Sequence, residues 1–182
     1  MGIPNLLTFL RIILIPVFIL LFYLPFRGSH VLAAIIFIFA AMTDWLDGYL
    51  ARSLGQVSKL GTFLDPVADK LIVVTALVLL VGDRVLPYLA IPAIVIICRE
   101  IMVSALREWM AEIGKRTRIA VTRIGKIKTT VQMLALILLL LYKPGAWFVL
   151  ALSGYLLLYL AALLTLWSMS LYLKAAWHDL SS

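Results

Sequence analysis

Long runs of apolar residues constrain the fold of this chain more than any other feature of its sequence. A helix of about 20 apolar residues crosses the hydrocarbon core of a bilayer. Backbone groups in lipid must be satisfied within the segment, so each such run is expected to be a helix. Six runs can be placed, covering roughly residues 6–26, 31–51, 61–81, 87–110, 128–142 and 147–173. We therefore predict an all-α integral membrane protein with six transmembrane helices in one bundle.

The composition agrees with this fold class. Hydrophobic residues make up 64% of the 182-residue chain, whereas about 45–50% is usual in soluble domains. No stretch between the runs is long enough for a separate soluble domain, so residues 1–182 are expected to form a single transmembrane domain. The one cysteine, Cys98, excludes a disulfide framework and a cysteine metal cluster. Its apolar neighbours predict that Cys98 is a small core residue.

The formal charge of +7 would suggest a nucleic-acid partner in a soluble protein. In a membrane protein, anionic headgroups and the positive-inside bias explain it, so no nucleic acid is expected. The turns at 27–30, 82–86 and 142–146 hold few basic residues, and the opposite side receives the basic cluster at 115–128. The positive-inside rule therefore predicts that this opposite side, with both termini, faces the cytoplasm.

Four aspartates lie in the polar stretch between the second and third runs. Asp44 and Asp47 are three residues apart, and Asp65 and Asp69 are four apart. Both spacings place side chains on one face of a helix. Because a short linker joins the two runs, both pairs are expected at the same, cytoplasmic side of the membrane. Two helices can thus direct two carboxylates each towards one point.

Four converging carboxylates need positive charge between them, since each is costly to desolvate. With oxygen donors and no nearby histidine or cysteine, hard divalent cations such as Mg²⁺ or Mn²⁺ are indicated. Two such ions would neutralise the four carboxylates, an arrangement suited to phosphoryl chemistry. A divalent-cation transporter is the alternative from another class. It predicts acidic residues along a path through the membrane, whereas these cluster towards one side.

The neighbours of the aspartates favour a phosphate ester over a transported ion. Gly48 and Ala51 give α-helical spacing of small residues, on which a flat base or a second backbone could approach closely. Arg52 lies about one turn further on, where a guanidinium could bind phosphate oxygens with two hydrogen bonds. Gly61 similarly leaves space beside Asp65.

The stretch resembles the CDP-alcohol phosphatidyltransferases, whose pattern D-x2-D-G-x2-A-R-x8-G-x3-D-x3-D it matches at every position. The matching residues are Asp44, Asp47, Gly48, Ala51, Arg52, Gly61, Asp65 and Asp69. The resemblance implies two divalent cations held by the four aspartates, with Asp69 also acting as the base that activates the acceptor hydroxyl. It further implies a homodimer in the bacterial cytoplasmic (inner) membrane. The residues implied around the cytidine and its pyrophosphate are Thr43, Asp44, Gly48, Ala51, Arg52 and Gly61.

Three further segments resemble the bacterial branch of this family that uses sn-glycerol 3-phosphate as acceptor. They are IPNLLTFLRIILIP near the start, REIMVSALREWMAE (99–112) and GKIKTTVQM (125–133). The implied reaction is CDP-diacylglycerol plus sn-glycerol 3-phosphate giving phosphatidylglycerol phosphate and CMP. Transfer to inositol phosphate, serine or another phosphatidylglycerol is the alternative within the family.

An acceptor with a phosphate group needs basic side chains. Arg118, Lys126 and Lys128 are the first candidates, because they lie on the cytoplasmic side near the start of the fifth run. Arg11 and Arg107 are second candidates. Each of these residues could instead bind anionic lipid headgroups. Arg11, one turn inside the first run, either extends its side chain to the membrane surface or faces a polar cavity.

Overall fold

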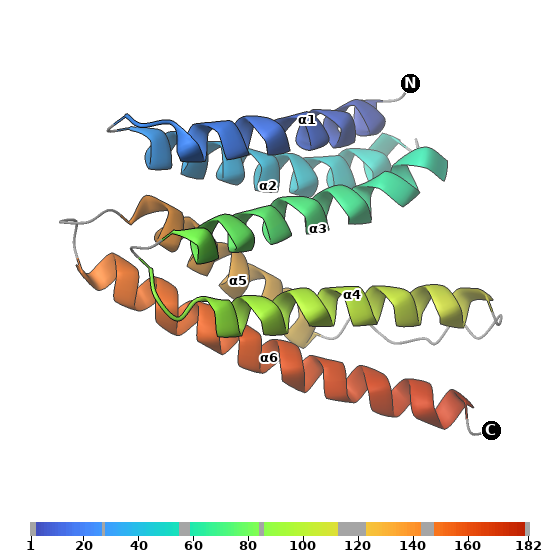
Figure 1. The fold of residues 1–182 in the computed structure, drawn as a ribbon. Helices are drawn as coiled ribbons and strands as arrows, with labels where there is room; N and C mark the ends of the chain where they lie inside the picture. Colours follow the sequence, from blue (N-terminus) through green and yellow to red (C-terminus); the bar gives the residue numbers. More distant parts are fainter. Residues whose placement is uncertain are drawn as a thin grey trace. The chain divides into compact units, whose positions relative to one another are not determined.

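Apart from short turns and helix ends, the described residues of the chain are helical. The computed structural model describes residues 3–26, 28–54, 59–83, 86–112, 123–142 and 148–180. These residues form no strand, and the all-α prediction is confirmed for them. Their helices are α1 (Ile3–Tyr23), α2 (Ser29–Leu54), α3 (Lys59–Gly82), α4 (Ala90–Glu112), α5 (Arg123–Leu141) and α6 (Phe148–Leu180) (Figure 1).

Each predicted span overlaps one of these helices, but several helices extend beyond the apolar run. The α2 helix continues through the segment YLARSL (49–54) to Leu54, and α6 continues through Lys174 to Leu180. Alanine, leucine, lysine and arginine favour helix in water as well as in lipid, so the helix does not end where the apolar run ends. Pro16 lies inside α1 without ending it.

Within the described parts of the chain, two helices hold stretches long and apolar enough to cross a membrane. They are Leu6–Tyr23 with 18 residues and Phe148–Lys174 with 27 residues; Ser29–Asp44 and Ile127–Leu141 are shorter apolar helices. The outward face of α1 is apolar too, with Leu6, Ile13 and Leu20 exposed at intervals of seven residues. An apolar outward face on a long apolar helix is typical of a membrane protein. The prediction of six spans in one bundle stays a prediction.

The chain divides into two compact units. The first contains residues 1–85 and 140–146, and the second contains residues 86–139 and 147–182. The division does not test the prediction of a single transmembrane domain.

In the first unit α1 packs against both α2 and α3 (Figure 1). Its buried face runs through Leu14, Phe18 and Phe22, at the spacing of one helix face. Phe18 packs against Phe37 of α2, with ring centroids 6.0 Å apart. The facing side of α2 is built largely of alanines. Helices in lipid associate through close van der Waals packing, which small residues permit.

In the second unit α4 packs against α6. The buried face of α6 includes Leu158, Ala161 and Thr165, spaced three or four residues apart. The α5 helix lies close to α6 at Gly154, where a Cβ atom would lie 2.8 Å from the Leu139 side chain. This unit therefore has a tightly packed helix contact that a larger residue would disturb.

The prediction that Cys98 is a core residue is wrong, because its side chain is exposed on α4. Apolar neighbours indicate burial in a soluble protein. On a membrane helix they are equally suitable for the face that contacts lipid, so apolar neighbours do not predict burial there.

Candidate functional site

The buried face of α1 changes from apolar to polar towards the N-terminus. Thr8 and Arg11 continue the stripe formed by Leu14 and Phe18, and both are almost completely buried. Arg11 has no exposed surface. The helix thus delivers a hydroxyl and a guanidinium into the packing interface of the first unit. A buried arginine in such a place requires acidic or carbonyl partners.

Those partners are the aspartates of α2 and α3. The Thr8 hydroxyl Oγ1 donates a hydrogen bond to Oδ1 of Asp65 at 2.5 Å. Arg11 Nη1 donates to Oδ1 of Asp69 and forms an ion pair with Oδ1 of Asp44 at 3.4 Å. Three aspartates from two helices therefore gather around one turn of α1. Their convergence was expected from the sequence, but the contribution of α1 was not.

Arg11 adopts one of its two sequence-based alternatives. It lies in polar surroundings made by carboxylates and does not extend to the surface of the first unit. Its Nε and Nη2 atoms are buried without a hydrogen-bond partner among the described residues. The spacing of Thr8 and Arg11 indicated a shared polar face. Nothing local in the sequence indicated which acidic residues that face would meet.

The remaining residues of the motif are described only in part. Thr43 is buried and donates its hydroxyl hydrogen bond to the Ala40 carbonyl oxygen at 2.7 Å, and Gly61 is buried in α3. The backbones of Asp47, Gly48, Ala51 and Arg52 are helical. The side chains of these four lie outside the described part of the structure, and so do the predictions made for them.

The donor chemistry of the described aspartates suits a hard divalent cation. Asp44 and Asp69 each present an oxygen to the same nitrogen atom, Arg11 Nη1, so a single positive centre is able to bridge them. Carboxylate oxygens are the ligands that Mg²⁺ and Mn²⁺ prefer. Among the described side chains, no group of three His, Cys, Asp or Glu residues is close enough to hold a metal ion. The Asp47 side chain is not among these described side chains.

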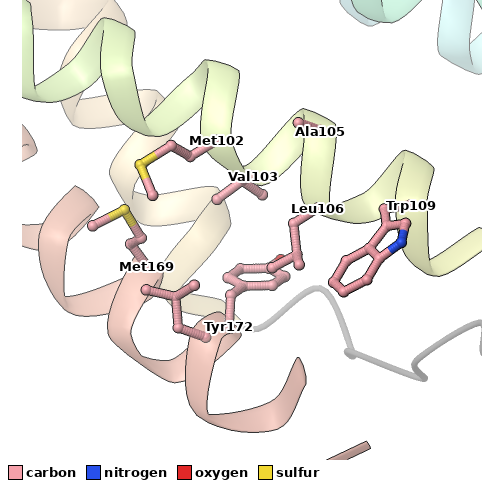
Figure 2. Close-up of a pocket in the computed structure, with 8 residues that line it drawn as sticks. Met102, Val103, Ala105, Leu106, Trp109, Met169 and Tyr172 are labelled. Carbon is pink, nitrogen blue, oxygen red and sulfur yellow. The ribbon is translucent and has the colours of Figure 1, made fainter. Parts of the chain in front are cut away.

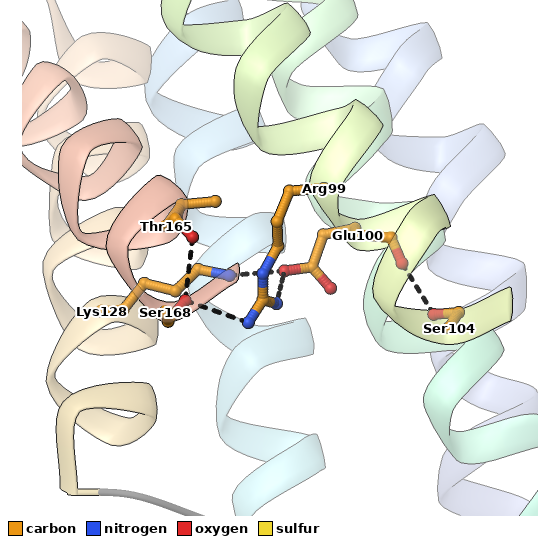
Figure 3. Close-up of polar contacts among 6 residues, drawn as sticks. All are labelled: Arg99, Glu100, Ser104, Lys128, Thr165 and Ser168. Carbon is orange, nitrogen blue, oxygen red and sulfur yellow. Dashed lines mark hydrogen bonds and ion pairs between the residues drawn. The ribbon is translucent and has the colours of Figure 1, made fainter. Parts of the chain in front are cut away.

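A second polar cluster lies inside the second unit and joins its three helices (Figure 3). Lys128 Nζ of α5 donates to Glu100 Oε1 of α4 at 2.6 Å. Arg99 Nη1 donates to the same oxygen at 2.9 Å. Arg99 Nη2 donates to Ser168 Oγ of α6 at 3.2 Å, and the Ser168 hydroxyl donates to the Thr165 carbonyl oxygen at 2.9 Å. One carboxylate oxygen thus serves two buried cations.

This cluster contains one of the residues predicted to bind the acceptor phosphate. It also contains two charged residues, Arg99 and Glu100, that the sequence reasoning missed. Lys128 is 1% exposed, whereas Arg118 and the side chains of Lys126 and Arg107 lie outside the described residues. Arg99 and Glu100 were missed because neighbouring positions on a helix do not share a face. Their long side chains nevertheless bend together. The signal that could have found them is two charges in the middle of an otherwise apolar run.

An apolar groove of about 360 Å³ lies beside this cluster, between α4 and α6 of the second unit (Figure 2). Its lining residues are Met102, Val103, Ala105, Leu106, Trp109, Met169, Tyr172 and Leu173. Tyr172 also lies under the Arg99 guanidinium, with Cζ 5.7 Å from the ring centroid. The lining side chains that the structure describes are all uncharged.

Comparison with known proteins gives a match over nearly the whole chain. The sequence model of the CDP-alcohol phosphatidyltransferase family matches residues 1–167. A Pseudomonas fluorescens protein is 57% identical over 189 residues, covering 100% of this chain and 93% of the relative. Proteins of Yersinia enterocolitica (53%) and Pectobacterium atrosepticum (54%) cover 99% and 98% of this chain and 97% of each relative. All three relatives are named CDP-diacylglycerol–glycerol-3-phosphate 3-phosphatidyltransferase.

Proposed function

The chain belongs to the CDP-alcohol phosphatidyltransferase family, and from this premise we propose that it transfers the phosphatidyl group of CDP-diacylglycerol to sn-glycerol 3-phosphate. The products are phosphatidylglycerol phosphate and CMP, so the enzyme serves phospholipid biosynthesis. The observation that carries the proposal is the gathering of Asp44, Asp65 and Asp69 around Thr8 and Arg11. Relatives that share more than half of the sequence carry the name of this activity.

Members of this family use divalent metal ions. We propose two Mg²⁺ or Mn²⁺ ions, held by Asp44, Asp47, Asp65 and Asp69. When bound, such ions supply positive charge beside the pyrophosphate and its leaving group. Two observations support this assignment. The donor atoms of the aspartates are all oxygens, and the Arg11 guanidinium, itself a positive group, lies between Asp44 and Asp69.

The chain's own residues position the reactants. Asp69 accepts the proton of the free primary hydroxyl of glycerol 3-phosphate, and that oxygen attacks the phosphorus next to the diacylglycerol. A new P–O bond forms, the pyrophosphate P–O bond breaks, and CMP leaves with the bonding electron pair. Arg52 binds the departing phosphate, which favours the charge that develops there. The residues proposed to surround the nucleotide are Thr43, Asp44, Gly48, Ala51, Arg52 and Gly61.

For the acceptor phosphate we propose Arg118, Lys126 and Lys128, with Arg11 and Arg107 as further candidates. The structure supports Lys128 most directly, because its ammonium is held inside the second unit and not on a lipid-facing surface. An ammonium in low dielectric attracts a phosphate dianion more strongly than one in water does.

We also propose six transmembrane spans in a single domain of the bacterial inner membrane, with the active site and both termini facing the cytoplasm, and a homodimer as the assembly. The distribution of lysine and arginine supports the orientation. The overlap of every predicted span with a helix supports the number of spans.

The proposal is tested with purified protein, CDP-diacylglycerol and Mg²⁺, offering one acceptor at a time and measuring CMP release. Release is expected with glycerol 3-phosphate and little with serine, inositol phosphate or phosphatidylglycerol. Release with one of these others would change the acceptor and leave the family chemistry intact. If the protein carried Mn²⁺ into liposomes and released no CMP with any acceptor, the result would favour a divalent-cation transporter.

A further inference from the structure

The Arg11 guanidinium lies among the aspartates of the first unit and uses only one of its three nitrogen atoms there. Nη1 donates to Oδ1 of Asp69 and forms an ion pair with Oδ1 of Asp44 at 3.4 Å. Nε and Nη2 are buried and find no hydrogen-bond partner in the described part of the chain. The three residues belong to the same unit.

Nε and Nη2 together form one edge of the guanidinium. Their N–H groups point the same way in one plane, which matches two oxygen atoms of a phosphate or carboxylate group. A buried N–H group without an acceptor costs free energy, because it has lost its water and gained nothing in return. Arg11 therefore leaves unused the edge that is best suited to an oxyanion, and it does so at a cost.

The nitrogen atom that is engaged contacts proposed metal ligands. Nη1 lies against Oδ1 of Asp44 and Oδ1 of Asp69, two oxygens that a shared divalent cation would use. Two positive charges at one pair of partly buried carboxylates repel each other strongly. Arg11 and a divalent cation therefore compete for these oxygens. Arginine does not lose its proton in proteins, so a displaced guanidinium needs another anionic partner.

The pyrophosphate of CDP-diacylglycerol is the anion that the proposed function places in this unit. The residues proposed to surround it lie between Thr43 and Gly61, within the first unit. Asp44 belongs to that set and is also an ion partner of Arg11. The side chain of Arg11 is long and flexible enough to turn its unused edge without any movement of the α1 backbone.

We propose that Arg11 is an exchangeable counter-ion. It neutralises Asp44 and Asp69 until a divalent cation takes over that role, and it then turns its Nε–Nη2 edge to a phosphate of the pyrophosphate. This inference rests on the proposed function, which supplies the cations and the nucleotide. It assigns Arg11 to the nucleotide and not to the acceptor phosphate. Cation binding thereby prepares the nucleotide site, so the two affinities are coupled through Arg11.

The test measures Mn²⁺ binding by electron paramagnetic resonance, with and without saturating CDP, on the detergent-purified full chain. Without CDP, Arg11→Met should bind Mn²⁺ about fivefold or more tightly than the wild type, because the competing charge is gone. The factor by which CDP raises Mn²⁺ affinity should fall about tenfold, because the phosphate loses two charge-assisted hydrogen bonds. The KM for glycerol 3-phosphate should change less than about twofold.

Two further variants complete the comparison. Ile13→Met places the same side chain at an exposed position of α1 and should match the wild type in every measurement. Arg11→Lys keeps the charge but has no two-nitrogen edge. It should therefore leave Mn²⁺ affinity near that of the wild type and still weaken the effect of CDP. It is the decisive variant if Arg11→Met does not fold.

Several results would overturn the inference. Unchanged or weaker Mn²⁺ binding by Arg11→Met would show that Arg11 orients the aspartates and does not compete with the cation. An unchanged effect of CDP, in Arg11→Met or in Arg11→Lys when only that variant folds, would show that the guanidinium does not bind the pyrophosphate. A higher KM for glycerol 3-phosphate with an unchanged effect of CDP would assign Arg11 to the acceptor. Failure of the proposed function is distinguishable, because the wild type would then bind no CDP and release no CMP.

Discussion

Replacing Arg11 with methionine tests the central contact of the candidate site. The substitution keeps an unbranched stem of similar length and removes the charge. Asp69 and Asp44 then lose the cation that lies between them. Breaking a fully buried ion pair costs about 3–5 kcal/mol. The Asp44 and Asp69 side chains are 49% and 41% exposed, so water screens part of this loss.

In the absence of divalent ions, we therefore expect the free energy of unfolding of Arg11→Met to be about 2 kcal/mol lower than that of the wild type. For a chain of this size, this lowers the unfolding midpoint by about 4–8 °C. The freed carboxylates should bind a cation more strongly than in the wild type. Adding Mn²⁺ should consequently raise the midpoint of Arg11→Met more than that of the wild type, because a ligand stabilises the state that it binds.

The assay is thermal unfolding of detergent-purified protein at one scan rate, in EDTA and in a Mn²⁺ titration. Ile13→Met is the matched control, since Ile13 is an exposed residue of the same helix. Arg11→Lys keeps a charge but not the guanidinium geometry and should fall between the two. Equal midpoints of Arg11→Met and the wild type in EDTA would refute the reasoning, and so would a Mn²⁺ shift no larger than that of the wild type.

Three further predictions concern single contacts. Thr8→Val removes the hydroxyl that donates to an aspartate of α3. It should weaken Mn²⁺ binding about fivefold or more, measured by calorimetry, whereas Thr8→Ser should retain it. Asp69→Asn should abolish CMP release while largely preserving nucleotide binding, because the amide cannot accept the hydroxyl proton. A loss of nucleotide affinity as large as in Asp44→Asn would instead make Asp69 chiefly a ligand. Gly154→Val should lower the unfolding midpoint by several degrees through overpacking against α5, and an unchanged midpoint would show that the neighbouring leucine moves away at no cost.

Much of the secondary structure could be predicted from the sequence. Apolar runs long enough to cross a bilayer located all six helices that the structure describes, because a backbone in lipid has few alternatives to the helix. The apolar runs predicted the ends of the helices less accurately. Polar residues at the start of α5 and the end of α6 extend these helices beyond the apolar runs. Fixed spacing likewise identified the aspartates, since residues three or four apart on a helix lie together.

The sequence by itself thus determined which residues share a helix face, and the tertiary structure decided which faces meet. Thr8 and Arg11 lie more than fifty positions from Asp65 and Asp69 in the chain, and no local pattern pairs them. The contact of Glu100 with Lys128 spans 28 positions, and the exposure of Cys98 depends on which side of α4 is packed. Helix periodicity is a local property of the backbone. The partner of a helix face is instead set by how side chains from distant segments fit and by which buried charges are matched.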